Sequence, residues 1–209
     1  SMRLPSTSFE FVPVILDYEN PKHKEILDLE YSNCKKFGEI LDDRYLLTNY
    51  RALVYDFEND KDKFSFDIRT IFNTQEECNI IKEYFKVFLF KVDFPTRSQM
   101  VRHRISWQEL SRRYVSAKRV PFEFYVSEKL KENQKVKDLI KQSEDLYFEL
   151  LENGVKPQEA RRVIPQMGYT QIWGAFMPKQ LDNYFKLRLD EHAQWEIRQT
   201  AIAMQELLG

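Results

Sequence analysis

Gln99 to Tyr114 reads QMVRHRISWQELSRRY, and we expect the rest of the chain to be organised around this stretch. Its cationic side chains are Arg102, His103, Arg104, Arg112 and Arg113. The whole chain has a formal net charge of −1, so its composition does not account for so many cations in one place. A run of charges is most often only a solvated face.

The spacing of residues within this stretch nevertheless favours a ligand site. Arg102 and Arg104 are two residues apart, so both would point to one side of an extended segment. A helix beginning near Gln108 would place Glu109 and Arg113 on one face. Arginine forks bind phosphate bidentately, and an adjacent serine or backbone N–H can complete the cradle. The residue types therefore predict a phosphorylated ligand.

The same stretch resembles the signature of the flavin-dependent thymidylate synthases, an Arg-His-Arg triplet followed after a short spacer by Ser, Arg and Tyr. The triplet is residues 102–104, and the spacer from Arg104 to Ser111 has six residues, one fewer than is usual in the family. A second block, from Leu146 to Leu208, is similar to the family's C-terminal region in order and spacing. Two motifs in the right order carry more weight than either alone.

This resemblance implies an α+β fold like that of the flavin-dependent thymidylate synthases, with an antiparallel sheet and helices concentrated in the C-terminal half. It implies reductive methylation of dUMP at C5, with FAD as cofactor, NADPH as reductant and methylenetetrahydrofolate as one-carbon donor. It also implies a homotetramer whose sites are shared between subunits. We predict that residues 1–209 form a single domain of this kind.

The resemblance also assigns the site residues. Those expected to bind the nucleotide are Gln99, Glu109, Ser111, Arg113, Arg161 and Arg188, and those expected to bind FAD are Arg102, His103, Arg104, Asn183 and His192. Arg188 is expected to stabilise charge on the uracil oxygen, because a fixed guanidinium stabilises an anion where it develops. Ser111 at the phosphate and Tyr114 beside the nucleotide complete the expected catalytic set, and Glu109 is expected to orient an arginine.

The flavin half of this pattern is less complete than the nucleotide half. The family's Phe-Glu-His segment upstream of the signature is not found, and the only earlier histidine is His23. Met177 stands where the family has an asparagine, and Lys179 where an arginine is usual. Two alternatives therefore stay open: an enzyme that modifies another pyrimidine nucleotide such as UMP, and a non-catalytic nucleotide-binding paralogue that has lost flavin.

Composition argues against several other classes of protein. A hydrophobic content of 43% is typical of a globular domain, and a pI of about 6.3 argues against a nucleic-acid partner. No apolar run has the length of a membrane span and no signal peptide is recognised, so we expect a cytoplasmic protein without a membrane partner. Cys34 and Cys78 lack metal-ligand spacing, so we predict buried reduced thiols and no metal site.

Local patterns predict the secondary structure. We expect strands at 9–17, 51–57, 64–72 and 85–94, the middle pair forming a hairpin. We expect helices at 21–38, at 75–86 with a Thr74–Glu77 capping box, at 95–100, at 136–152 before Gly154, from Pro157 to Pro165, at 180–187, and from Asp190 as N-cap. Residues 116–126 are expected to be a loop whose aromatic rings pack.

Overall fold

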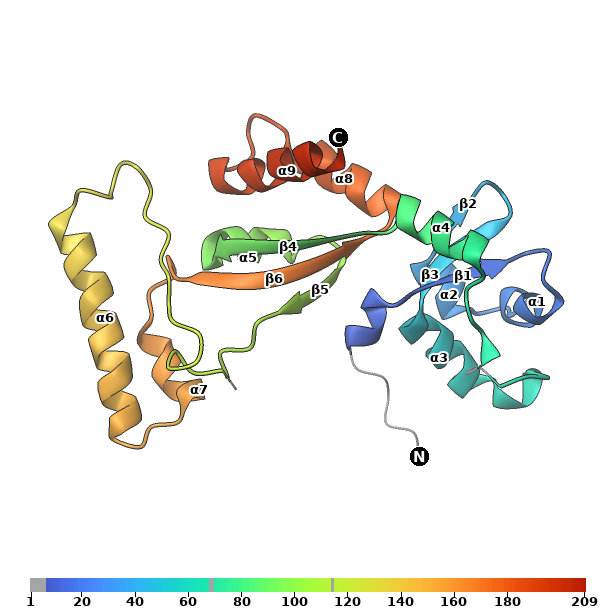
Figure 1. The fold of residues 1–209 in the computed structure, drawn as a ribbon, viewed down its shortest axis with the longest axis horizontal. Helices are drawn as coiled ribbons and strands as arrows, with labels where there is room; N and C mark the ends of the chain where they lie inside the picture. The colour runs from blue at the N-terminus through green and yellow to red at the C-terminus, as the bar shows by residue number, and fades with distance from the viewer. Residues whose placement is uncertain (1–6, 68–69, 114) are drawn as a thin grey trace. The chain divides into compact units, whose positions relative to one another are not determined.

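In a computed structural model of the chain, the described residues are 7–67, 70–113 and 115–209 (Figure 1). Tyr114 and part of the strand predicted at 64–72 lie outside them. The chain divides into two compact units. The first unit contains the chain up to Phe88 with Arg104–Gln108 and Gly174–Leu189, and the second contains Leu89–His103, Glu109–Trp173 and Asp190–Gly209. A single domain over residues 1–209 stays a prediction.

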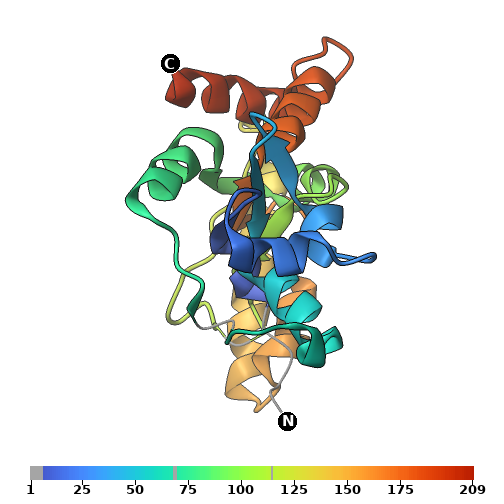
Figure 2. The same cartoon turned by 90° about the vertical axis from the view of Figure 1, so that its right-hand side faces the viewer.

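The first unit is built on an antiparallel sheet of order β1-β3-β2, in which Ile15 pairs with Leu47. Helix α1 packs against β1 and α3 against β3. Figure 2 draws these elements in blue and cyan from a second direction. Its elements are η1 (Thr7–Phe11), β1 (Pro13–Asp17), α1 (Pro21–Leu27), α2 (Asn33–Phe37), β2 (Glu39–Leu41), β3 (Tyr45–Asn49), α3 (Tyr50–Asn59), η2 (Lys61–Lys63), α4 (Gln75–Tyr84) and α8 (Pro178–Arg188).

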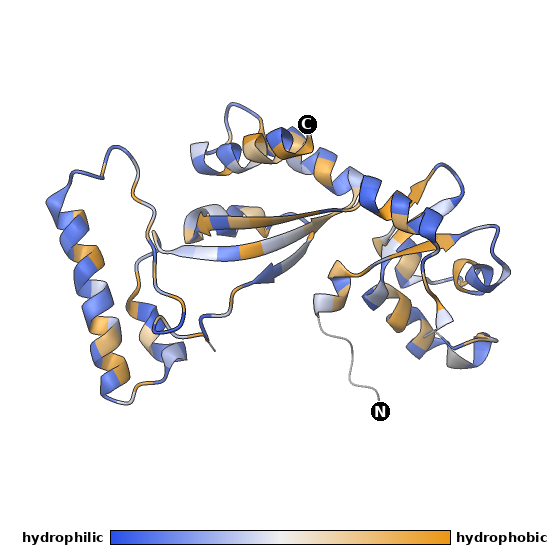
Figure 3. Cartoon of the chain, in the orientation of Figure 1, coloured by the Kyte–Doolittle hydropathy of each residue, from blue (hydrophilic) through white to orange (hydrophobic). Residues whose placement is uncertain are grey.

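A second three-stranded sheet has the order β4-β6-β5, with β4 at Lys86–Asp93, β6 at Tyr169–Phe176 and β5 at Ser106–Glu109. Each of these strands has residues in both units. The helices of the second unit are α5 (Phe94–Met100), α6 (Gln134–Glu152), α7 (Pro157–Ala160), the 3₁₀ helix η4 (Arg161–Val163) and α9 (Trp195–Leu208). Helix α6 carries both hydrophilic and hydrophobic residues along its length and packs against α7 and η4 (Figure 3).

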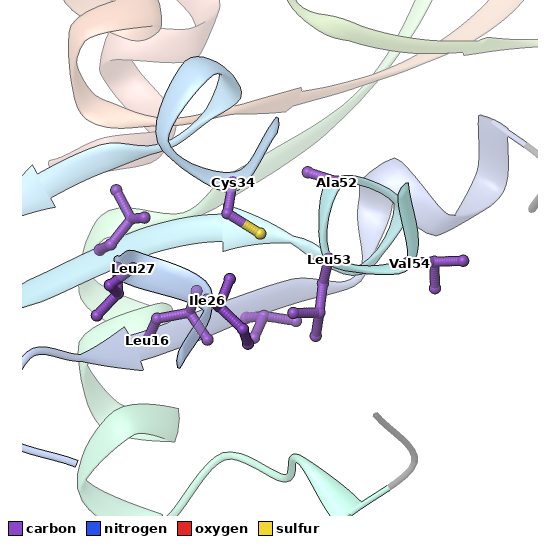
Figure 4. Close-up of a cluster of buried hydrophobic side chains, with 9 residues drawn as sticks. Leu16, Ile26, Leu27, Cys34, Ala52, Leu53 and Val54 are labelled. Atoms are coloured by element: carbon purple, nitrogen blue, oxygen red, sulfur yellow. The ribbon is translucent and has the colours of Figure 1, made fainter. Parts of the chain in front are cut away.

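The first unit has an apolar core between its sheet and its helices. Leu16, Ile26, Leu27, Cys34, Ala52, Leu53 and Val54 belong to this cluster and are labelled in Figure 4. Cys34 is fully buried and Cys78 is half-buried, and both are free cysteines. Burial raises the pKa of the Cys34 thiol well above its ordinary value. This thiol is therefore a packing group, as predicted, and is not activated as a nucleophile.

Asp56 explains why residues 21–38 form two short helices where one was predicted. Its carboxylate, 1% exposed, accepts hydrogen bonds from Ser32 Oγ at 2.7 Å, Asn33 N at 2.6 Å and Cys34 N at 2.9 Å. These donors lie at the start of α2, where backbone N–H groups lack helical partners. A carboxylate from α3, more than twenty residues away, thus caps the start of α2. For this reason the helical sequence pattern of residues 21–38 does not form one continuous helix.

The hairpin predicted at 51–57 and 64–72 is wrong, because 50–59 is helix α3. The side chain of Asn49 accepts a hydrogen bond from Ala52 N at 3.0 Å and so caps this helix. Ala52, Leu53 and Asp56 are buried along it, at helical spacing. The β-branched and aromatic residues of this segment, which suggested a strand, reflect burial. The Asn49 cap favours the helix over the strand.

Three further features of the first unit were predicted differently or were not predicted. The strand predicted at 9–17 begins only at Pro13, and η1 precedes it. The pair β2–β3 was not predicted, and its turn places Asp42 and Asp43 at positive φ. His23, early in α1, is 5% exposed, and its Nδ1 accepts a hydrogen bond from Asp17 N at 2.9 Å.

Most elements after residue 73 are confirmed. Thr74 and Glu77 form the predicted capping box of α4, and β4, α5, α6 and α8 lie where expected. Gly154 follows α6 at φ +81°, a conformation that favours glycine. The last helix begins at Trp195 rather than after Asp190, whose carboxylate accepts a hydrogen bond from His192 N at 2.8 Å in the preceding turn.

Two predictions within the signature are wrong. Residues 102–104 are not extended but form turns and bends after α5, where His103 N donates to Met100 O at 3.1 Å. The predicted helix near Gln108 is strand β5, which ends at Glu109. This strand is a neighbour of β6 in the second sheet, so pairing with a strand some sixty residues later decides its conformation.

The α+β class is confirmed, but the predicted single sheet is replaced in the described residues by two three-stranded sheets. Helices also occur throughout the first half of the chain, although the longest, α6 and α9, lie in the second. Among the described residues, no helix is both long enough and apolar enough to cross a bilayer.

Candidate functional site

The second unit contains a cavity of about 490 Å³ with arginine side chains on its wall. We call it the arginine cavity. Its four arginines are Arg97, Arg112, Arg161 and Arg162. Hydroxyl groups of Ser111, Tyr169 and Thr170 and the apolar side chains of Phe94, Phe122 and Ile164 line it as well, together with Glu109. Cations, hydroxyls and rings of this kind suit a ligand with an anionic group and a planar part.

Glu109 is held by two other residues of the wall. Arg97 donates to Glu109 Oε2 through Nε at 2.9 Å and also through Nη2, while Thr170 Oγ1 donates to Oε1 at 3.0 Å. The side chains of Arg97 and Glu109 are 34% and 23% exposed, so solvent only partly screens their attraction. Glu109 does orient an arginine, as the sequence led us to expect, and that arginine is Arg97.

Arg112 stabilises the loop that follows the signature. Its guanidinium donates to the carbonyl oxygens of Val120 and of Pro121, the latter at 3.1 Å, and lies 4.8 Å from the centre of the Phe122 ring. Burial lowers the pKa of Arg112 below its ordinary value. The Phe122 and Tyr147 rings form a T-shaped pair with a centroid distance of 4.8 Å, which confirms the predicted packing of this loop.

Arg113 and Arg161, both assigned to the nucleotide phosphate, meet at one residue of α7. Arg113 Nε donates to Gln158 Oε1 at 3.2 Å, and Arg161 Nε donates to the backbone oxygen of Gln158 at 3.3 Å. Arg162 forms an exposed ion pair with Glu159 at 3.1 Å, which contributes little to stability. The tertiary structure thus joins arginines that are nearly fifty residues apart.

The other predicted nucleotide residues lie elsewhere. Gln99 Nε2 donates to Gln194 Oε1 at 2.6 Å, at the start of α9, and Gln99 is not among the residues lining the arginine cavity. Arg188 is half-buried in the last turn of α8, in the first unit. Tyr114 lies outside the described residues.

The predicted flavin residues fall into both units. Arg102 is exposed and His103 is buried, at 9%, in the second unit. Arg104 and Asn183 are exposed in the first unit. The side chain of His192 is 85% exposed in the second unit, with its Nδ1 2.9 Å from an oxygen of Asp190.

A second cavity, of about 540 Å³, lies wholly within the first unit, and we call it the first-unit cavity. Its cationic side chains are Lys36, Arg51, Arg104 and Lys179, and its larger apolar ones are Phe37, Phe85, Ile105 and Met177. Gln180 Nε2 donates to the backbone oxygen of Arg104 at 2.9 Å, which fixes the signature segment to α8.

Aromatic packing supports this segment from the side. Trp107 and Phe176 form a T-shaped pair with a centroid distance of 5.7 Å, and Phe176 and Tyr184 form another at 5.6 Å. A Cβ atom on Gly174 would lie 2.5 Å from the Trp107 ring, so only glycine admits the ring here. The backbone from Arg104 to Trp107 is therefore held by the packing of Trp107 against Phe176 and Gly174 and by the hydrogen bond from Gln180.

Sequence reasoning missed Arg97, Gln158 and Thr170. Arg97 lies two residues before Gln99, outside the stretch 99–114 whose cations predicted a ligand site. Gln158 and Thr170 fall within the block 146–208, where no polar pattern separates them from surface residues.

Residues 68–209 match the model of the protein family described as thymidylate synthase complementing protein. The chain is 38% identical over 136 residues to the flavin-dependent thymidylate synthase of Thermotoga neapolitana, covering 58% of this chain and 61% of that protein. It is 38% identical over 140 residues to that of Thermosipho africanus, covering 56% and 60%. For that of Pyrococcus furiosus the identity is 35% over 129 residues, covering 57% and 53%. The chain therefore spans less than two thirds of the length of these relatives.

Proposed function

Because the chain belongs to the thymidylate synthase complementing protein family, we propose that it is a flavin-dependent thymidylate synthase that methylates dUMP reductively at C5. The observation that carries this proposal is the arginine cavity, where signature residues meet residues of the C-terminal block. Ser111 and Arg112 come from the first, and Arg161 from the second.

The arginine cavity supports binding of the nucleotide phosphate. Its wall has four guanidinium groups against one carboxylate, and that carboxylate is neutralised by Arg97. Arg161 and Arg113 are oriented by Gln158, so less side-chain entropy is lost when they close on an anion. The Ser111 hydroxyl, exposed on the same wall, can donate to a phosphate oxygen.

Arg188 is proposed to act on the pyrimidine ring. When C5 attacks an electrophile, negative charge develops on the ring oxygen, and a guanidinium held beside it lowers the energy of that state. Arg188 is half-buried, so its charge is less screened than that of an exposed arginine.

The chemistry of the side chains around the first-unit cavity fits FAD. Four cations suit its diphosphate, and the apolar side chains of Phe37, Phe85 and Met177 suit a planar ring system. We propose that Arg104, which lines this cavity, contributes to its binding. Arg102, His103, Asn183 and His192 do not line it, and we propose that they contribute to binding FAD held by another subunit. FAD, when bound, supplies the transfer of the one-carbon unit from methylenetetrahydrofolate and the hydride that completes the methyl group. The protein binds and orients the reactants.

We further propose NADPH as the reductant and a homotetramer as the active assembly, both supported by the resemblance of the two sequence motifs. In such an assembly the two cavities of one chain need not serve the same active site. Assembly is tested by the molar mass in solution, measured by light scattering, where a tetramer of 25.3 kDa chains is expected.

The activity is tested by incubating the protein with FAD, NADPH, methylenetetrahydrofolate and either dUMP or UMP. We expect thymidylate from dUMP and no methylated product from UMP. A methylated product from UMP but none from dUMP would show that the protein is a related enzyme that acts on another pyrimidine nucleotide. Binding of dUMP without flavin and without product would show a non-catalytic nucleotide-binding paralogue.

A matched pair of variants tests the arginine cavity. Arg161→Gln should weaken dUMP binding about tenfold or more, the usual effect of losing a charge-assisted hydrogen bond. Arg119→Gln removes an exposed arginine that does not line the cavity and should leave binding unchanged. Equal affinities of both variants for dUMP, measured by calorimetry, would contradict this placement of the phosphate.

A further inference from the structure

The first-unit cavity is built from two parts of the sequence. Arg104 and Lys179 lie within the residues that match the family model, 68–209. Lys36, Arg51 and Tyr55 precede residue 68 and lie outside that match. The part of the chain before residue 68 therefore provides two of the four cations of this cavity. Arg104 of the signature and Lys179 provide the other two.

Arg51 is held in place before any ligand binds. It lies in the first turn of α3, where it forms an ion pair with Glu10, and its Nη2 donates to Tyr55 Oη at 3.2 Å. Its guanidinium carbon lies 5.5 Å from the centre of the Tyr55 ring. The side chain is only 26% exposed, so ordering it costs little further entropy on binding.

Lys36 is a different kind of cation. It lies in the last turn of α2, is exposed, and its Nζ is 5.2 Å from the centre of the Phe37 ring. A lysine ammonium is a point charge on a flexible stem, so it can follow an anionic oxygen as the ligand settles. Arg51 and Lys36 thus provide one fixed and one mobile positive charge.

The carboxylates of the wall do not cancel these charges. Glu10 is engaged by Arg51, and Glu39 Oε2 accepts a hydrogen bond from the backbone N–H of Lys179 at 3.0 Å. Two carboxylates against four cations leave a surplus of positive charge. Beside it, Phe37, Phe85 and Met177 provide an apolar wall. Such a cavity suits a planar ligand that carries more than one negative charge.

We propose that Arg51 and Lys36, which lie outside the family match, bind the diphosphate of the flavin cofactor in the first-unit cavity together with Arg104 and Lys179. This inference rests on the proposed function, because it takes the ligand of this cavity to be FAD. It gives the N-terminal part of the chain a role on the flavin side, where the family's Phe-Glu-His segment is not found in the sequence.

The test compares FAD with riboflavin, which has the same ring system but no phosphate. Binding of each to the full-length protein is followed by quenching of flavin fluorescence. Arg51→Gln and Lys36→Gln should each weaken FAD binding about tenfold, and the double variant about a hundredfold, as expected for lost charge-assisted contacts. Riboflavin affinity should not change, so the preference of the protein for FAD should fall.

Two control variants of the first unit match these changes. Arg44→Gln removes an arginine that pairs with Asp17 at 2.8 Å, as Arg51 pairs with an acid, but that does not line the cavity. Lys24→Gln removes an exposed helix lysine, also away from the cavity. Both should bind FAD as the native protein does, and circular dichroism checks that every variant folds.

Each other outcome overturns the inference in a distinguishable way. If the variants bind FAD as tightly as the native protein, Arg51 and Lys36 do not contact the diphosphate, and the proposed function stands without them. An equal fall in riboflavin affinity would show a structural role only. If the native protein binds no flavin, the proposed function fails as well. Because Lys36 is exposed, Lys36→Gln alone decides the matter if Arg51→Gln does not fold.

Discussion

The two cavities of the chain have similar volumes, about 490 and 540 Å³, and four cations each, but they hold these cations differently. In the arginine cavity all four are arginines, and Arg97, Arg112 and Arg161 are tethered to a carboxylate or to backbone oxygens. In the first-unit cavity two are lysines, and the wall includes residues that precede the family match. Rigid guanidinium groups suit a single compact anion, whereas mobile ammonium groups suit a longer ligand.

The largest expected effect separates binding from chemistry. Arg188→Ala should reduce turnover about a thousandfold, because it removes a charge that acts on the developing anion. Folding and flavin content should stay nearly unchanged. Lys186→Ala, the other basic residue in the last turn of α8, is the matched control and should keep its activity. Full turnover by Arg188→Ala would remove this residue from the active site.

The next effect tests the scaffold of the first-unit cavity. Asp56→Ala should lower the free energy of unfolding by about 4 kcal/mol, because it leaves the buried donors of Ser32 and Cys34 without their acceptor. Since α2 carries Lys36, FAD binding should fall with it. Urea denaturation followed by circular dichroism measures the loss. Asp60→Ala, at the C-cap of α3, removes an ion pair with the exposed Lys63 and should be close to neutral. A change below about 1 kcal/mol would show that the network is dispensable.

A smaller effect tests the arginine cavity through Gln158. Arg113→Ala should weaken dUMP binding by about 2 kcal/mol, since a charged hydrogen bond is lost. Gln158→Ala should produce part of this loss without removing a charge, because it frees Arg113 from its side-chain acceptor but keeps the backbone oxygen that holds Arg161. Calorimetric titration with dUMP gives both values. If Gln158→Ala binds dUMP like the native protein, the tether does not prepare the site.

The smallest effect is a pH dependence confined to the first unit. Burial lowers the pKa of His23 below its ordinary value of 6.5. The unfolded chain therefore binds the proton more readily, so stability is complete above pH 6.5 and declines as the pH falls through the folded-state pKa. His23→Asn keeps an acceptor for Asp17 N and should flatten the decline in urea midpoint between pH 7.5 and 5.5.

The sequence predicted the second half of the fold better than the first. Helix α4 with its capping box, and α6 with Gly154 after it, depend on signals within a few residues. In the first half, α2 is capped by Asp56 from a distant helix, and local patterns cannot reveal such a partner. The signature segment was predicted only in part. Its residues were recognised as a candidate site, but its strand β5 depends on pairing with β6, which the local sequence does not reveal.

The sequence by itself determined the family, the α+β class and the residue types of the candidate site, because these depend on motif order and composition. The tertiary structure decided which side chains share a cavity. Arg97 meets Glu109, and Gln158 meets Arg113, across separations that no periodicity encodes. It also brought Arg51 to the cavity of Arg104. Such contacts follow from packing apolar faces and satisfying buried polar groups, which are properties of the whole chain.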